Sequence, residues 1–107
     1  MKTAIDLVTT LCNIADAMVE SRTVQIGDAA LRTLRDEVRC SRMQLSESDF
    51  AIDYEASCLI DCISELAYAR TDHDRQREER ALMYVNTLRT FLRIDVNNAV
   101  RKRAATS

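Results

Sequence analysis

Cysteine and histidine are the residue types in this sequence most able to hold a metal ion. Cys58 and Cys62 lie four residues apart, which places both thiols on one side of a helix, and His73 is the single histidine. Zinc sites use Cys-x-x-Cys spacing and four ligands, whereas the other two cysteines, Cys12 and Cys40, are remote in the sequence. We therefore predict no metal site and expect the cysteines to pack as small apolar residues.

Catalysis by His73 would need a nucleophile beside it in a partly dry site. His73 instead belongs to a densely charged segment, 72–80, which is typical of a solvated helix start. The Glu-x-x-His motif of di-metal bundles is absent. Phosphate-binding loops and nucleophile elbows need glycine, and the chain has one, Gly27. We predict no catalytic residue and no cofactor, and therefore a protein that is not an enzyme.

Arginine makes up thirteen of the fifteen basic residues, and its planar fork suits phosphate and carboxylate partners. A first set falls within an arc of roughly 80° on one helix face: Arg32, Arg35, Arg39 and Arg42. A second set lies toward the end of the sequence: Arg89, Arg93, Arg101, Lys102 and Arg103. Both sets are candidates for binding a partner or a nucleic acid. The alternative for the last three residues is that they complement the negative end of a helix dipole.

The first set, which we call the arginine stripe, has a second interpretation. The stretch 44–69 contains no lysine or arginine but six acidic residues. If the two helices pack antiparallel, Asp49 and Asp53 come near the C-terminal half of the stripe. The stripe would then be neutralised inside the protein, and both interpretations remain open. Mimicry of nucleic acid by the acidic helix is a weaker alternative, because this charge density is ordinary for an exposed face.

The elements that carry these residues are predicted to be helical almost throughout. The chain has no proline and one glycine, the two residues that most disfavour helix interiors. Apolar residues recur at intervals of three and four over four stretches: about 3–21, 28–43, 49–70 and 73–100. We predict an all-α single domain, a small antiparallel bundle of about four helices that is complete as a monomer or completed in a dimer. Residues 101–107 are expected to form a frayed basic tail.

Short polar breaks separate the predicted helices. Gly27 is expected to supply a permissive backbone for the first turn, and Asp28 to cap the second helix. Thr71 and Asp72 mark the last break and are expected to cap the fourth helix. The third helix is the most apolar, and Tyr54 widens its apolar face, which favours a central position for this element.

Charge and hydropathy restrict the partners and the compartment. The formal net charge is −2, so the chain as a whole is neither strongly basic nor strongly acidic. No stretch approaches the ~20 apolar residues of a membrane span, and Asp6 and Asp16 interrupt what would be the apolar region of a secretory leader. Four cysteines without such a leader favour reduced thiols. We expect a cytoplasmic protein that does not contact a membrane.

In its short length, helical composition and lack of catalytic motifs, the chain resembles small phage-encoded accessory proteins, and among these the helical anti-CRISPR proteins. The resemblance covers the general character of the whole chain, and no residue motif carries it. It implies a non-catalytic inhibitor that blocks target-DNA binding or nuclease recruitment in a CRISPR effector, with the arginines as first candidates for nucleic-acid contact. The alternative function is a self-assembling helical module that binds DNA or RNA, or assists packaging, through the arginine stripe.

Overall fold

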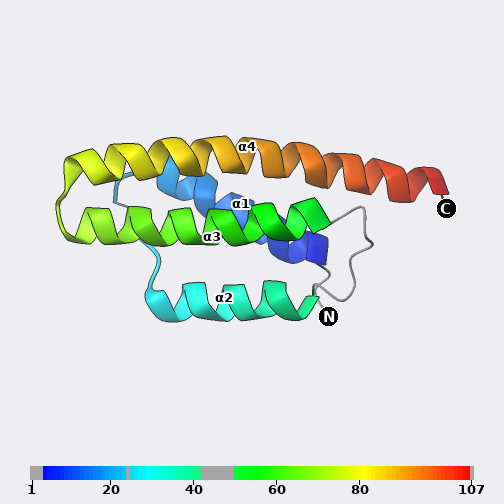
Figure 1. The fold of residues 1–107 in the computed structure, drawn as a ribbon, viewed down its shortest axis with the longest axis horizontal. Helices are drawn as coiled ribbons and strands as arrows, with labels where there is room; N and C mark the ends of the chain where they lie inside the picture. The colour runs from blue at the N-terminus through cyan, green and yellow to red at the C-terminus, as the bar shows by residue number, and fades with distance from the viewer. Residues whose placement is uncertain (1–3, 24, 42–49, 107) are drawn as a thin grey trace.

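The computed structural model describes residues 4–23, 25–41 and 50–106, and all regular structure in these ranges is α-helical (Figure 1). The prediction of an all-α protein with four helices is confirmed. The helices are α1 (Ala4–Glu20), α2 (Asp28–Ser41), α3 (Phe50–Thr71) and α4 (Arg75–Thr106).

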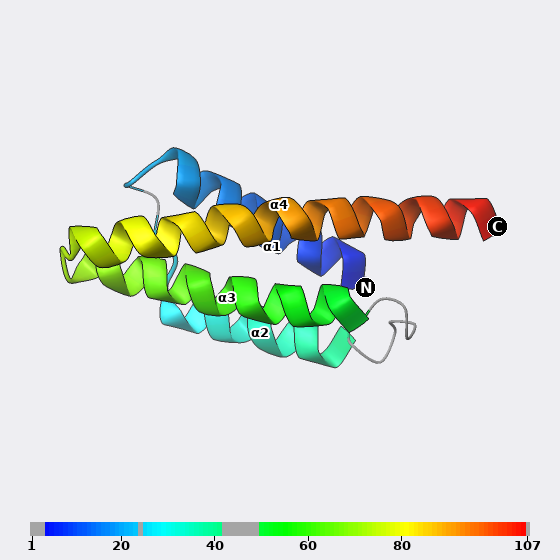
Figure 2. The same cartoon turned by 45° about the horizontal axis from the view of Figure 1, so that its top comes forward.

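The helix α4 sets the length of the molecule. Its 32 residues correspond to about 48 Å of helix, against a longest extent of 49 Å for the protein. It packs against α3 along most of that helix and against α1, while α2 packs against α3 and α1 (Figures 1 and 2). The helices α2 and α3 run in opposite directions, because Asp28 at the start of α2 meets Tyr68 near the end of α3. Figure 1 shows the same for α1 with α2 and for α3 with α4.

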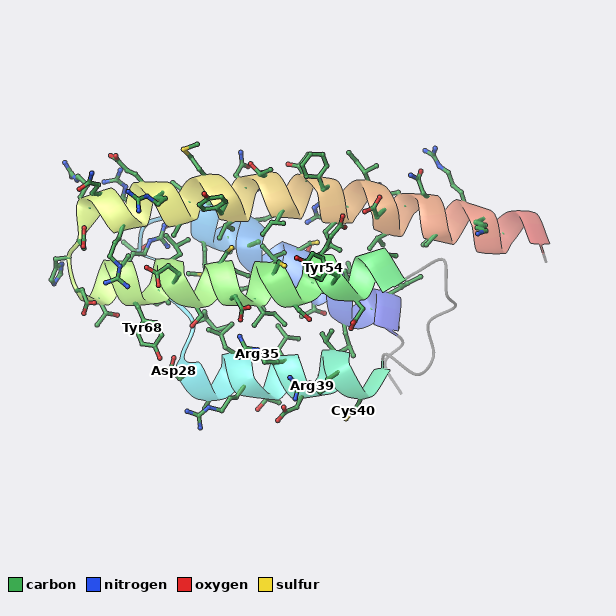
Figure 3. The ribbon with its side chains drawn as sticks, in the orientation of Figure 1. Asp28, Arg35, Arg39, Cys40, Tyr54 and Tyr68 are labelled. Carbon is green, nitrogen blue, oxygen red and sulfur yellow. The ribbon has the colours of Figure 1, made fainter. Side chains whose placement is uncertain are left out.

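The core lies where the apolar seams of the helices meet. The apolar seam of each helix is the set of apolar residues that recur at intervals of three and four. The described residues of the seams of α2, α3 and α4 are buried or packed against the core, which includes the fully buried Leu11, Leu59, Ile63 and Leu92. Tyr54 is an exception: 72 % of it is exposed, so the expectation that it widens the buried face of α3 is wrong. Its side chain lies on the flank of α3 that borders α4 rather than beneath that helix (Figure 3).

The turn between α3 and α4 is made by backbone hydrogen bonds that close the end of α3. The amides of His73 and Asp74 donate to the carbonyls of Arg70 and Ala69, which is a Schellman motif. His73 has φ 54°, the left-handed conformation that glycine commonly adopts at this position. Asp74 then caps α4, because its Oδ1 accepts from the Arg77 amide at 3.1 Å. The expected caps, Thr71 and Asp72, belong instead to the end of α3 and to the turn.

The start of α2 also differs from the prediction. The Gly27 carbonyl accepts the first helical hydrogen bond, from the Leu31 amide, so Gly27 is the N-cap residue. Its φ is not positive, and a side chain added there would meet nothing within 4 Å. The turn therefore does not need glycine. Asp28 lies in the first turn of α2, and its carboxylate accepts from the Tyr68 hydroxyl at 2.8 Å, which ties α2 to α3.

A buried arginine ties the end of α1 to the α3–α4 hairpin. The side chain of Arg70 is 6 % exposed, and its guanidinium donates to the Met18 carbonyl at 2.7 Å and to the Ser21 carbonyl at 3.4 Å. Its Nε lies 3.7 Å from the Glu78 carboxylate. The last turn of α1 has no basic residue of its own, so Arg70 supplies the cation that complements the negative end of the α1 dipole.

The C-terminal end of α4 corrects one prediction. Residues 101–106 continue the helix instead of fraying, and this end of α4 projects beyond α3 (Figure 1). Among the described residues, none of the helices combines the length and apolarity needed to cross a bilayer.

Candidate functional site

The arginine stripe on α2 faces carboxylates of α3 over part of its length. Arg35 donates to the Asp61 carboxylate at 2.5 Å. Arg35 and Arg39 line a polar groove of about 300 Å³ with Asp53, Ser57 and Asp61, and both arginines lie along the space between α2 and α3 (Figure 3). Two cations and two anions share this groove, so its charge is balanced.

The remaining members of the stripe lie at its two ends. Arg32 is exposed and lines a smaller recess beside Tyr68. Arg42 and its expected partner Asp49 lie outside the described residues. The structure therefore brings Asp53 to the stripe as the antiparallel arrangement required, and pairs Arg35 with Asp61, a residue not singled out before.

The second basic set divides between the interior of the fold and the free end of α4. Arg89 and Arg93 both donate to the carboxylate of Asp16 on α1, Arg89 at 3.1 Å. These two arginines therefore join α4 to α1. Arg101 and Lys102 are exposed near the end of α4, and the side chain of Arg103 lies outside the described part.

The outer face of α4 is the surface that sequence reasoning missed. Between Arg80 and Arg101, a segment described in full, the charged residues are Arg89, Arg93 and Asp95, and all three are partly buried, with 39 % of the Arg93 side chain exposed. The exposed positions are all uncharged: Met83, Tyr84, Asn86, Thr87, Thr90, Phe91, Ile94, Asn97, Asn98 and Val100. We call these ten residues, together with the adjacent Tyr54 of α3, the uncharged face.

Large apolar side chains dominate this face. Met83 is 72 % exposed, and Tyr84, Phe91 and Ile94 are each at least half exposed. With Tyr54 they present on the order of 600 Å² of accessible surface. Exposed apolar side chains that gather on one side of a protein in this way are typical of interaction sites.

The sequence contains apolar residues on two sides of α4, but only the side that forms the buried seam was used in the prediction. The apolar seam of α4 runs through Val85, Leu92 and Val96, which are buried. Met83, Phe91 and Ile94 fall on the opposite side of the same helix. Half of the ten exposed positions on the outer side of α4 are therefore apolar, in addition to its buried seam.

Two carboxyl groups meet between α3 and α4 beside this face. Glu55 comes from α3, and Asp95, whose carboxyl group acts on it, comes from α4. Burial, then the hydrogen bond to Asp95 and the negative charge of Asp95, raise the pKa of Glu55 to about 7. Glu55 Oε2 is dry and has no hydrogen-bond partner within the described structure.

Of the residues first considered for metal binding, Cys58 and Cys62 are neighbours one turn apart on α3. All four cysteines carry free thiols, and burial raises the pKa of the Cys12 and Cys62 thiols. His73 is exposed in the turn after α3. Among the described residues, no group of three His, Cys, Asp or Glu side chains is placed to hold a metal ion.

Comparison of the chain with protein-family models, with curated proteins and with solved structures found no match in any of the three.

Proposed function

We propose that this chain is a non-enzymatic binding protein that occludes a surface of a larger protein or nucleoprotein complex, and that the uncharged face of α4 is its docking surface. The observation that carries the proposal is the run of ten exposed, uncharged positions on α4. Charged residues make up 30 % of this chain, so a helix face of this length without one needs a reason.

The chemistry of the face indicates a protein surface as its partner. Interface cores are depleted in charged residues and enriched in tyrosine, phenylalanine and methionine, which are the large side chains found here. Nucleic-acid binding depends on cations that neutralise phosphates, and the cation at the edge of this face, Arg93, is held by the Asp16 carboxylate. The asparagines and threonines between the apolar residues supply hydrogen-bond groups without selecting a partner of either charge.

The anti-CRISPR resemblance gives the proposal its particular form, in which the larger complex is a CRISPR effector and docking prevents target-DNA binding. The alternative, a nucleic-acid-binding module, depends on arginines of which three already lie on carboxylates: Arg35, Arg89 and Arg93. It predicts salt-sensitive retardation of DNA or RNA at micromolar protein, lost in the Arg35→Glu, Arg39→Glu double variant.

The test places a charge in the centre of the face. Phe91→Glu should weaken capture of the partner from an extract of the source cells, and inhibition of target-DNA binding by a CRISPR effector, by about 30-fold or more. Gln76→Glu adds the same charge at an exposed position of α4 outside the face and should behave as the wild type.

The outcomes separate the possibilities. Loss with Phe91→Glu and retention with Gln76→Glu supports the docking surface. Equal capture by the wild type and Phe91→Glu contradicts it. If light scattering shows a wild-type dimer that Phe91→Glu dissociates, the occupant of the face is a second copy of the chain, which contradicts a role in occluding a larger complex.

A further inference from the structure

We infer that the uncharged face binds a single amphipathic helix of its protein partner, one that packs lengthwise along α4 and carries a carboxylate near each end. This inference rests on the proposed function, because it names the kind of element that occupies the same surface. Binding of such a helix is a property that the isolated chain can be tested for.

Five positions of the face form a row along α4, which we call the outer row. They follow one another at intervals of three, four, three and four residues: Tyr84, Thr87, Phe91, Ile94 and Asn98. All five are exposed. They lie within an arc of roughly 80° and along about 21 Å of helix. This alternation keeps a row of side chains against a second helix over its whole length, because two helices that wind around each other meet every 3.5 residues.

The outer row lies on the side of α4 that is nearer to α3. Arg77 precedes Tyr84 by seven residues, or two turns, and therefore shares its side of the helix. The guanidinium of Arg77 binds the Glu65 carboxylate of α3 at 2.7 Å. On the same flank of α3, Tyr54 is exposed where that helix borders α4 (Figure 3). A helix laid along the outer row therefore packs on α4 and can also contact the ring of Tyr54.

The charges at the two ends of the row indicate what the bound helix must carry. The same alternation leads to Arg80, four residues before Tyr84, and to Arg101, three residues after Asn98. Both arginines are exposed, and every exposed position between them is uncharged. A complementary helix is therefore apolar along its middle and has a carboxylate near each end. Exposed ion pairs of this kind add little affinity, but they fix the position of the helix along α4.

The same charges disfavour a second copy of this chain as the occupant. Two α4 helices packed in the same direction would bring Arg80 onto Arg80 and Arg101 onto Arg101. Packed in opposite directions and centred on Phe91, they would bring Arg80 onto Arg101. Like charges meet in either arrangement and oppose it. The outer row is therefore better suited to a helix of a different protein.

The area of the face is suited to one helix. Its large side chains present on the order of 600 Å² of accessible surface. A stable protein interface buries about 800 Å² on each partner, and the smaller side chains of the face supply part of the difference. Asn98 is the amide side chain of the row. An asparagine among apolar contacts pairs with a polar side chain of the facing helix and fixes its register.

A synthetic helical peptide tests the inference on the isolated protein. The probe has about 21 residues, or six turns of helix, with leucines at alternating intervals of three and four, alanine and glutamine elsewhere, and two glutamates at each end. The anisotropy of a fluorescent label on the peptide should rise to a plateau as protein is added. The peptide with lysines in place of the glutamates should bind about threefold or more weakly. A scrambled peptide of the same composition should not bind.

Adjacent residues of α4 provide matched variants. Thr87→Glu places a charge in the outer row and should weaken binding of the peptide by about tenfold or more. Asn86→Glu adds the same charge at the neighbouring exposed position, outside the row, and should weaken binding by less than about threefold. Asn98→Glu and Asn97→Glu repeat the comparison from the same starting residue, since both asparagines are exposed and one of them belongs to the row.

Two results would overturn the inference: no binding of the peptide at about 0.1 mM protein, or equal weakening by Thr87→Glu and Asn86→Glu. The proposed function fails separately. If the peptide does not bind but Phe91→Glu still abolishes capture of the partner, the face docks a different kind of protein surface, and the inference alone is wrong. If the peptide binds along the row but the wild type and Phe91→Glu capture the partner equally, the proposed function is wrong and the binding of a helix remains.

Discussion

At the scale of single residues, the notable feature of His73 is its backbone conformation. It occupies the left-handed position that ends α3, and its φ of 54° costs a non-glycine residue free energy. Histidine is among the residue types that tolerate this region better than most. The exposed side chain takes part in no described cluster of titratable groups.

Replacing His73 by glycine should therefore stabilise the protein by about 0.5–1 kcal/mol, because the left-handed conformation is free of strain for glycine. The midpoint of urea unfolding measures the change. His73→Ala is the matched control and should give no gain, since alanine suffers the same strain. A glycine variant no more stable than the alanine variant would show that the turn is not strained.

The titration of Glu55 makes the free energy of unfolding depend on pH. Its pKa is raised from 4.5 to about 7 in the fold, so between these values the folded state holds a proton that the unfolded state has lost. The contribution of Glu55 is full below the unfolded pKa and is lost as pH rises toward 7. Glu55→Gln has no such proton to lose, so it should lose less stability than the wild type between pH 5 and pH 8. Urea unfolding at both pH values measures the difference, and a difference that does not change with pH would contradict the raised pKa of Glu55.

At the scale of elements, polar contacts as well as apolar packing hold α1 to α3 and α4. Arg70 reaches from α3 to the carbonyls that end α1, and Asp16 receives Arg89 and Arg93 of α4. The Arg70 contacts are buried, and loss of a buried charged donor leaves its acceptors unsatisfied. Exposed pairs such as Arg35 with Asp61 contribute much less.

Arg70→Ala should therefore destabilise the protein by about 2–4 kcal/mol. Arg75→Ala, an exposed arginine in the first turn of α4, should change stability by less than about 0.5 kcal/mol. Denaturant unfolding of both variants gives the comparison. If the two substitutions cost the same, Arg70 does not hold the end of α1.

Helix positions could be predicted because they depend on local chemistry. The absence of proline and the regular apolar seams placed the helix ends within a few residues, except at the end of α4. There the basic residues 101–103 favour continuation, since cations stabilise the negative end of a helix dipole. The capping residues were harder to predict. Gly27 rather than Asp28 is the N-cap of α2, because the carboxylate of Asp28 has a tertiary partner, the Tyr68 hydroxyl.

The candidate site could be predicted only in part, because exposure depends on which helices meet. The sequence shows that Phe91 and Ile94 lie opposite the seam of α4, but not whether another helix packs over them. In the fold α2 packs against α3 and α1, so it leaves this side of α4 open. The pairing of Arg89 with Asp16 joins residues 73 positions apart, which no local pattern indicates.

At the scale of the whole molecule, the charged side chains that pair between helices and the uncharged outer side of α4 lie in different parts of the protein. Arg35 and Arg39 on α2 and Arg89 and Arg93 on α4 face carboxylates of neighbouring helices, while the exposed positions on the outer side of α4 are uncharged. This distribution favours binding through apolar contact over binding through charge. The complex should therefore resist salt, in contrast to a protein–nucleic-acid complex, whose affinity falls steeply as salt rises.

Salt dependence of the complex is a prediction at this scale. Between 50 mM and 200 mM salt, the affinity for the protein partner should change by less than about threefold. Phosphate binding through six or more cations would lose about 10³-fold or more over the same range. A steep loss would indicate that the arginines, rather than the uncharged face, make the contact.

Oxidative footprinting of the captured complex tests the central claim most directly. Hydroxyl-radical modification of Met83, Tyr84 and Phe91 should fall several-fold when the partner is bound, because these exposed side chains become buried. Tyr68, which is 47 % exposed beside α2, is the internal reference and should be modified equally in the free and bound protein. Unchanged modification of the three α4 residues, with protection at Tyr68, would contradict a docking surface on α4.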